Sequence, residues 1–468
     1  MQKRKNTGAV MYLRYSLIAL FLCLLLTIQT SGQEITSQNT KSLTLDQSIS
    51  IALKRNTTLA KSEYGISGYE STVLSSYGDL LPRVSASGGW EWYRTEDEGR
   101  LVNIGGALIQ TSKQVKENRN WSARVSSNWT LFNGLSNYAS IRKNEKELES
   151  AKLTLERLKQ DIVFQTISRY YAILNLEQLV FVKEENVKWN QKNYEIIKEK
   201  SRLGAGTMAD VYAQQVKLGT AELELLKSKN DYENEKSNFL FYLGLDVLEK
   251  YSFVDPKIDG TLKKEPEAVT KEYAEFRELI EQALENRPDY RSAQYSLDAA
   301  YDDLSIARGS YMPSLTNNAS FSLDGESPNV LFDSKLYSFG LTLSIPIFQG
   351  WKIDNSVQYA KIQAKNSEIA LSDLEREIKL NIQKIYLDLQ TAEKRLDVSQ
   401  KNVEAARENL KIEEEKYSLG STTLLNVLIA NADYVNAQTN LINSRFEYLR
   451  LKEEINYYLG IIDFKKFE

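Results

Sequence analysis

The sequence predicts a membrane α+β fold, in which four β-strands per chain join long antiparallel coiled coils and the same arrangement occurs twice. Three observations support this prediction: an internal repeat along most of the 468 residues, apolar and polar residues that alternate over about ten positions, and proline-free stretches with heptad spacing. The expected boundaries are 1–32 for an export signal, 33–245 for the first copy, 246–275 for an irregular linker outside the helical rod, and 276–468 for the second copy.

The composition excludes several classes of function. The chain has no histidine, one cysteine at position 23 and a formal net charge of -4. Catalytic triads with histidine, thiol catalysis, His or Cys metal sites and a disulfide framework therefore lack the residues that they need. A mildly acidic chain does not favour binding to nucleic acid. We expect no catalytic residue, no cofactor and no metal, so the chain is not expected to be an enzyme.

The first 32 residues have the pattern of a signal peptide. Basic residues at 3–5 precede an apolar run over 17–28, and small residues follow it up to Gly32. Cleavage near Gly32 would export the chain and remove its only cysteine. One alternative is a membrane anchor, but the run is shorter than the roughly 20 residues that a spanning helix needs. Another is lipidation of Cys23, which the leucine before it disfavours.

An internal repeat organises the rest of the chain. A shift of 216 residues aligns Phe132 with Phe348 and Tyr242 with Tyr458 without a gap between them. Upstream the shift becomes 231 residues, so the first copy holds 15 extra residues between Pro82 and position 121. We expect a chain with pseudo-twofold symmetry, in which the insertion forms an extracellular loop.

Four segments of about ten residues alternate apolar with polar side chains, and this length crosses a bilayer when the strand is tilted. They lie near 83–94, 121–131, 314–324 and 336–347. In the last segment, for example, Phe339, Leu341 and Leu343 alternate with Gly340 and Thr342.

Four strands cannot close a barrel alone, and an open sheet edge in lipid costs several kcal/mol for each unpaired backbone group. Three chains that share one barrel would supply 12 strands, enough to enclose a lumen. An aromatic belt against lipid would then consist of Trp90, Trp92, Trp121, Trp129 and Tyr337. The alternative is an exported soluble coiled-coil scaffold or adaptor, whose strands pack as a small sandwich with the tryptophans in its core.

The stretch 135–203 contains no proline, and a helix of that length is about 100 Å long. The segment that follows has heptad spacing at Val211, Leu218 and Leu225, which the second copy repeats at Val427 and Tyr434. These patterns predict two long antiparallel helical hairpins.

The hairpin tips are expected near 204–207 and 420–423, where glycine ends one helix and threonine begins the next. A glycine-rich phosphate loop is the alternative at the first tip. It is disfavoured because no lysine follows Gly206 and no strand precedes the loop.

The duplicated order of these features resembles the TolC-type outer-membrane efflux protein family over about 43–460. The segments that carry the resemblance are Asn286-Arg287-Pro288-Asp289, Leu81-Pro82 with Met312-Pro313, Phe132-Asn133-Gly134 with Phe348-Gln349-Gly350, and Leu203-Gly204 with Leu419-Gly420. The resemblance implies a homotrimer in the cell outer membrane, whose 12-stranded barrel continues into a long periplasmic α-helical barrel. Such a protein is the exit duct of a tripartite efflux or type I secretion system, with a periplasmic adaptor and an inner-membrane pump as partners.

The resemblance also implies roles for residues at the tips. Adaptor contacts are expected at Gly204, Gly206, Thr207, Val211, Gly420, Thr423 and Val427. A gate is expected at Asp210, Tyr417, Thr422, Asn426 and Ile429.

The second tip departs from the family pattern, since the family's acidic ring and basic lock fall on Asn426, Ile429 and Thr422. We therefore expect neither feature there. A hydrogen bond from the Tyr417 hydroxyl to the Asp210 carboxylate would be a latch worth about 1.5–3 kcal/mol. The alternative is that Asp210 is present because the helix dipole favours a carboxylate in the first turn.

Overall fold

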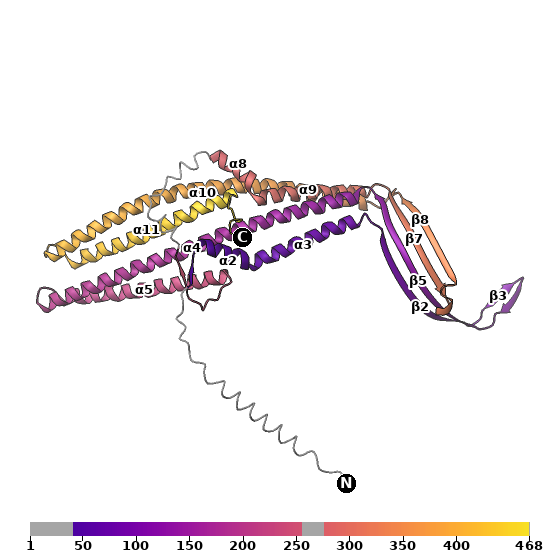
Figure 1. Ribbon diagram of the computed structural model, residues 1–468, viewed down its shortest axis with the longest axis horizontal. Helices are drawn as coiled ribbons and strands as arrows, with labels where there is room; N and C mark the ends of the chain where they lie inside the picture. Colours follow the sequence, from indigo (N-terminus) through magenta and orange to yellow (C-terminus); the bar gives the residue numbers. More distant parts are fainter. Residues whose placement is uncertain (1–40, 255–275, 468) are drawn as a thin grey trace, which may run out of the picture.

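The computed structural model describes residues 41–254 and 276–467, so the predicted signal peptide and the predicted linker from position 255 onward lie outside the described residues. Figure 1 shows a long rod of paired helices that meets a four-stranded sheet at an angle. The tips of the two helical hairpins lie together at the end of the rod far from the sheet.

The helix bounds confirm the repeat. The first copy contains α2 (Leu45–Arg55), α3 (Thr57–Gly78), α4 (Ser136–Arg202) and α5 (Met208–Tyr242), and the second contains α8 (Phe276–Asn286), α9 (Pro288–Gly309), α10 (Lys352–Ser418) and α11 (Leu424–Leu459). Both ends of α2 and α3 map onto α8 and α9 by the 231-residue shift, and both ends of α4 map onto α10 by the 216-residue shift. The two long helices hold 67 residues each. None of the helices among the described residues is long and apolar enough to cross a lipid bilayer.

Each long helix begins with the same strained turn. Leu135 and Trp351, which precede α4 and α10, both have φ of 65°. A left-handed conformation costs a non-glycine residue roughly 1–2 kcal/mol, so the surrounding structure must hold the turn in place. The glycine before each of them also has positive φ. A Cβ atom at Gly134 would in addition clash with the carbonyl oxygen of Gly309, so this position requires glycine.

The sheet consists of β2 (Arg83–Asp97), β5 (Gln114–Asn133), β7 (Ser314–Gly325) and β8 (Ser334–Ser344), in the order β2-β5-β7-β8. All three pairings are antiparallel. The outer strands β2 and β8 have no further strand partner among the described residues.

The register of the sheet separates two faces. One row across the four strands reads Ala86, Val125, Phe321 and Tyr337, and the adjacent row reads Ser85, Ser126, Ser320 and Ser338. Neighbouring serines in that second row form hydrogen bonds, at 3.0 Å between Ser85 and Ser126 and 2.7 Å between Ser320 and Ser338. The sheet therefore has one apolar and one polar face, as the alternation in the sequence predicts.

The structure contradicts the sandwich alternative for the strands. The four long strands form one layer, and Trp90, Trp121, Phe339 and Leu341 are all exposed in the single chain. A sandwich core would bury them.

Three strand ends differ from the prediction by three residues or more. β2 continues to Asp97 and β5 begins already at Gln114, because both faces become polar there and hydrophobic alternation no longer marks the strand. β8 ends at Ser344 instead of position 347, since Pro346 has no N–H to donate. The predicted loop includes a small hairpin, β3 (Leu101–Ile104) and β4 (Ala107–Gln110), as Figure 1 shows beyond the sheet.

The main core lies at mid-rod, where α2, α4, α5 and a short parallel pair meet. This pair is β1 (Lys41–Leu43) with β6 (Tyr251–Phe253). Tyr170 and Phe239 are fully buried there beside Phe253, with ring centroids 5.6–6.2 Å apart. In the second copy, α8, α10 and α11 pack around a separate hydrophobic core.

Candidate functional site at the helical tips

The first tip is closed by its own polar side chains. Thr207 is the N-cap of α5: its hydroxyl accepts a hydrogen bond from the Asp210 backbone N–H at 3.2 Å and donates one to the Asp210 carboxylate at 2.7 Å. Gly204, with φ of 76°, ends α4. These contacts explain the glycine and threonine as capping chemistry.

The second tip is bonded differently. Gly420 has φ of 74°, as at the first tip, but Thr423 makes no side-chain capping bond. Instead the Asn426 amide donates to the Thr422 hydroxyl at 2.8 Å, and Thr422 donates to Glu413 at 3.0 Å. Glu413 was not among the predicted site residues. Lys416 donates a hydrogen bond to it and lowers the pKa of its carboxyl group, and the Thr422 bond acts in the same direction against partial burial.

The predicted latch between Tyr417 and Asp210 is not formed. The Tyr417 ring packs in a small apolar cluster with Ile197 and Leu424, and the Lys200 ammonium lies 4.7 Å from its centroid. Burial, followed by the Asp210 charge, raises the pKa of Tyr417, but no hydrogen bond joins the two side chains. Asp210 lies in the first turn of α5, as the helix-dipole alternative has it, and its carboxylate accepts a hydrogen bond from the N-cap residue Thr207.

The structure divides the predicted adaptor contacts into two groups. Val211 and Val427 are buried in the clusters that pack the hairpins together. The exposed members are Gly204, Gly206, Thr207, Gly420 and Thr423. Two exposed leucines, Leu203 and Leu419, lie beside them and are absent from the predicted contacts, because capping chemistry gives a role to the glycine and the threonine of each tip but none to the leucine. Ile429 is exposed as well.

Sequence reasoning also missed polar contacts that join the two hairpins near the tips. The Trp189 indole N–H on α4 donates to Glu414 on α10 at 2.7 Å, and Asn431 on α11 donates to Asn186 on α4 at 3.0 Å. Within the first hairpin, fully buried Gln214 on α5 donates to the backbone carbonyl of Asn190 on α4 at 3.0 Å. A buried polar layer of this kind favours one alignment of packed helices over others.

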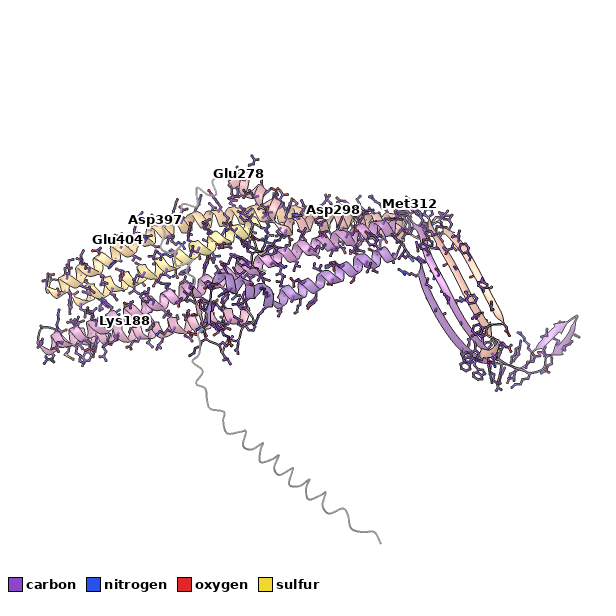
Figure 2. The ribbon with its side chains drawn as sticks, in the orientation of Figure 1. Lys188, Glu278, Asp298, Met312, Asp397 and Glu404 are labelled. Carbon is purple, nitrogen blue, oxygen red and sulfur yellow. The ribbon has the colours of Figure 1, made fainter. Side chains whose placement is uncertain are left out.

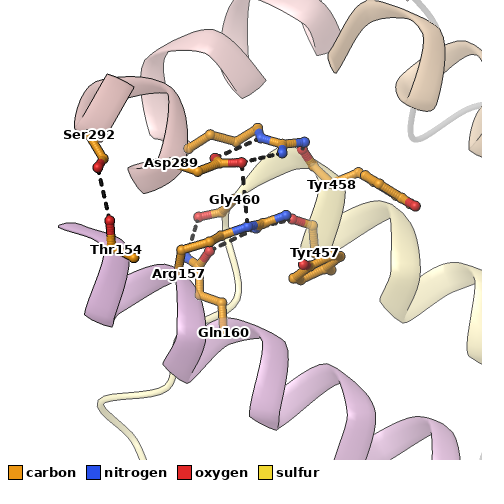
Figure 3. Close-up of polar contacts among 9 residues, drawn as sticks. Thr154, Arg157, Gln160, Asp289, Ser292, Tyr457, Tyr458 and Gly460 are labelled. Carbon is orange, nitrogen blue, oxygen red and sulfur yellow. Dashed lines mark hydrogen bonds and ion pairs between the residues drawn. The ribbon is translucent and has the colours of Figure 1, made fainter. Parts of the chain in front are cut away.

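A second polar cluster, the mid-rod clip, joins the copies where α11 ends (Figure 3). Arg157 on α4 donates to the Tyr457 carbonyl at 2.8 Å, and its guanidinium lies 3.7 Å from the centre of the Tyr457 ring. Arg287 donates to the Tyr458 carbonyl at 3.3 Å and to Asp289 at 3.0 Å. The clip thus gives side-chain donors to carbonyl groups in the last turn of α11, where the helix supplies no N–H group four residues further on.

Asp289 lies between the two arginines of the clip, 3.9 Å from the Arg157 guanidinium. Burial alone would raise the pKa of Asp289, but the hydrogen bond from Arg287 and the charges of Arg287 and Arg157 outweigh it and lower the pKa. Burial lowers the pKa of Arg157. The clip accounts for the Arg-Pro-Asp segment at the start of α9 as a structural element.

The model of the outer membrane efflux protein family matches residues 48–245 and 279–460. The outer membrane efflux protein BepC of Brucella suis is 20% identical over 419 residues, which cover 89% of this chain and 85% of BepC. The outer membrane protein TolC of Vibrio cholerae is 22% identical over 403 residues, or 83% and 84% of the two chains.

Solved structures of outer-membrane channels have the same fold. A structure of CusC superposes with a TM-score of 0.77 at 15% identity, covering 89% of this chain and 92% of CusC. The CmeC outer membrane channel of Campylobacter jejuni gives a TM-score of 0.75 at 17% identity, with 90% and 88% covered. The chain therefore belongs to the outer membrane efflux protein family and is an outer-membrane transport channel with a long periplasmic helical portion.

Proposed function

We propose that three copies of this chain form a passive exit duct with a shared 12-stranded barrel in the outer membrane. The observation that carries the proposal is the single open sheet, in which β2 and β8 lack partners among the described residues while the apolar face is exposed. Unpaired strand edges are not tolerated in lipid, so other copies must complete the sheet. Twelve strands leave a lumen instead of a core filled by side chains.

The two faces of the sheet fit this arrangement. The serine row of Ser85, Ser126, Ser320 and Ser338 would face the water-filled lumen, and the apolar rows would face lipid. We place one level of the aromatic belt at Trp90, Trp92 and Trp121. The ring centroids of Trp90 and Trp121 are 6.1 Å apart. Trp129, whose indole donates to the Leu80 carbonyl at 2.9 Å, lies at the helical end of the sheet, and Tyr337 pairs with Phe321 in the band between.

The partners that we propose are a periplasmic adaptor and an inner-membrane pump, which dock at the tips. Exposed Leu203 and Leu419 offer apolar contact area beside the exposed glycines and threonines named above. Thr422, Asn426 and Ile429 would line the aperture, and all three are uncharged. The polar groups at the tips serve helix capping and hairpin packing. The chain would therefore act as a passive, water-filled path without enzymatic activity, and the pump would supply the driving force for transport.

The experiment that tests this proposal measures the protein mass of particles extracted by detergent from outer membranes, followed by conductance in planar bilayers. A mass of three mature chains together with a steady pore conductance is the expected result. A chain that is recovered as a monomer without detergent would contradict the proposal.

A further inference from the structure

The apolar face of the sheet contains a hollow of about 280 Å³ between β2, β5 and β7. Its lining on this face consists of Ala86, Gly88, Ala123, Val125, Phe321 and Leu323. Ser87 and Arg124 complete the lining, but they alternate with these residues along β2 and β5, so their side chains belong to the polar face. The hollow therefore opens towards lipid in the proposed barrel.

Small side chains create the hollow and large ones surround it. Gly88 lies directly opposite Ala123, so this row of the sheet has little side-chain volume on β2 and β5. In the adjacent row Trp90 lies opposite Trp121, and Phe321 lines the hollow from the other side. The volume is below the roughly 300–1,000 Å³ of sites for whole small molecules, and it suits a segment of one hydrocarbon chain.

The hollow lies towards the cell exterior. The helices meet the sheet at the junction between rod and sheet, which Met312 marks in Figure 2, and the rod is the periplasmic portion. The hollow lies near the opposite end of the sheet, since the next row beyond it holds Trp121 opposite Gly325, where β7 ends. The lipids at this height are those of the outer leaflet of the outer membrane.

Two basic side chains lie on the same face at the outer end of the hollow. Lys335 lies opposite Leu323, and the turn that joins β7 to β8 ends just before it. Arg119 lies opposite Trp92, two residues beyond Trp121 on β5. Within the described part of the chain, neither of these two cations forms an ion pair.

Two other basic side chains beyond the tryptophans are already paired. Arg94 forms an ion pair with Glu96 at 2.6 Å, and the Lys113 ammonium lies 3.8 Å from the same glutamate. Lys335 and Arg119 thus differ from their basic neighbours in having no carboxylate partner among the described residues. Cations beside an apolar groove at the membrane surface suit a lipid phosphate group.

We propose that the hollow binds an acyl chain of lipid A, the phosphorylated and multiply acylated lipid of the outer leaflet, while Lys335 and Arg119 bind its phosphate. The apolar lining accounts for the chain, and the two cations account for the anionic headgroup. The rings of Trp90 and Trp121 lie between them, at the level where acyl chains meet headgroups. The inference rests on the proposed function, because the apolar face meets lipid only if the sheet belongs to the barrel.

Retention of lipid by the full-length protein tests the site. The protein is extracted from outer membranes in mild detergent, and the lipid A that co-purifies is measured per chain by mass spectrometry. Ala123→Leu fills the hollow, whereas the matched control Ala319→Leu makes the same change on the apolar face of β7, outside the lining. We expect Ala123→Leu to retain less lipid A than Ala319→Leu by at least roughly tenfold, because a few CH₂ groups displaced from the groove account for that factor.

The headgroup contacts are tested in the same way. Lys335→Gln and Arg119→Gln should each lower the retained lipid A about tenfold, since each removes a charge-assisted contact with phosphate. The control is Lys113→Gln, whose ammonium is already paired with glutamates, and retention should stay at the wild-type level. When lipid A without its phosphate groups is added to delipidated protein, Lys335→Gln and the wild type should bind it equally.

Equal retention by Ala123→Leu and Ala319→Leu would overturn the hollow as the site of the acyl chain. Wild-type protein that binds dephosphorylated lipid A as tightly as lipid A would overturn the headgroup contacts, and a glycerophospholipid retained in place of lipid A would overturn the choice of lipid. In each of these cases a particle with the mass of three chains would leave the duct intact. A monomer recovered without detergent would overturn the duct and the lipid site together.

Discussion

The mid-rod clip allows one substitution to be predicted in detail. Asp289→Asn keeps the shape of the side chain and removes the one negative charge between Arg157 and Arg287. The side chains of these arginines are only 11% and 7% exposed. Arg287 would lose a charge-assisted partner, and two buried cations would be left next to each other. We expect the last turn of α11 to open more readily, because both arginines bind its carbonyl groups.

The magnitude follows from the burial of the pair. Removing one partner of a buried ion pair costs about 3–5 kcal/mol, and the Asp289 side chain, which is 27% exposed, places this case at the lower end. An increase of about 3 kcal/mol in the relative free energy of the closed turn corresponds to a loss of roughly 100-fold in hydrogen-exchange protection, since about 1.4 kcal/mol is a factor of ten.

Hydrogen exchange followed by mass spectrometry on peptides from the end of α11 measures this change. The matched control is Asp397→Asn on α10 (Figure 2), whose partner Lys401 is mostly solvent-exposed, so its loss should alter protection by less than about tenfold. Unchanged protection at the end of α11 in Asp289→Asn would refute the assignment of Asp289 as the residue that holds the two arginines.

Three further predictions concern pH, the tips and the junction. The pKa of Asp289 is lowered in the folded state, so its stabilising contribution is present above the unfolded-state pKa of about 3.9 and is lost as the pH falls through the folded-state pKa. The difference in hydrogen-exchange protection between the wild type and Asp289→Asn should therefore vanish in strongly acidic buffer. Trp189→Phe, which loses the hydrogen bond to Glu414, should weaken the contact between the two hairpins by about 1.5–3 kcal/mol and raise pore conductance. Tyr417→Phe should change neither quantity. The reverse result would support a latch between Tyr417 and Asp210. Gly309→Ala should destabilise the junction by about 1–3 kcal/mol in thermal unfolding, because its Cβ atom would clash with Ser136; an unchanged midpoint would show that α4 can shift freely.

Periodic signals in the sequence predicted most of the fold. Self-similarity predicted the repeat, alternation of apolar and polar residues predicted the four strands, and heptad spacing predicted the two long hairpins. The 216-residue shift relates both ends of α4 and α10, because a positive-φ glycine comes before each start and a Leu-Gly pair follows each end. The extensions of β2 and β5 escaped prediction, since strand pairing continues there without an apolar face.

The candidate site was less predictable, because its contacts join residues distant in the sequence. Nothing near Asn186 indicates that Asn431 is its partner, and Trp189 and Glu414 belong to different copies. The predicted latch failed for a local reason instead. Asp210 lies three residues after Thr207, so its carboxylate accepts a hydrogen bond from the N-cap hydroxyl instead of from the Tyr417 hydroxyl.

The two tips show how duplicated segments diverge once each has its own neighbours. Asp210 and Asn426 are counterparts in the repeat, as are Thr207 and Thr423. The aspartate reinforces the N-cap of α5, and this capping bond is worth about 1 kcal/mol. The asparagine instead donates to Thr422, and this contact continues to Glu413 on α10. The start of α11 is thus held by side-chain hydrogen bonds to α10 of the same hairpin, and not by a side-chain bond from its N-cap residue Thr423. Since Asn426 carries no charge, three second tips brought together around one axis would not repel one another at this position, whereas aspartates would.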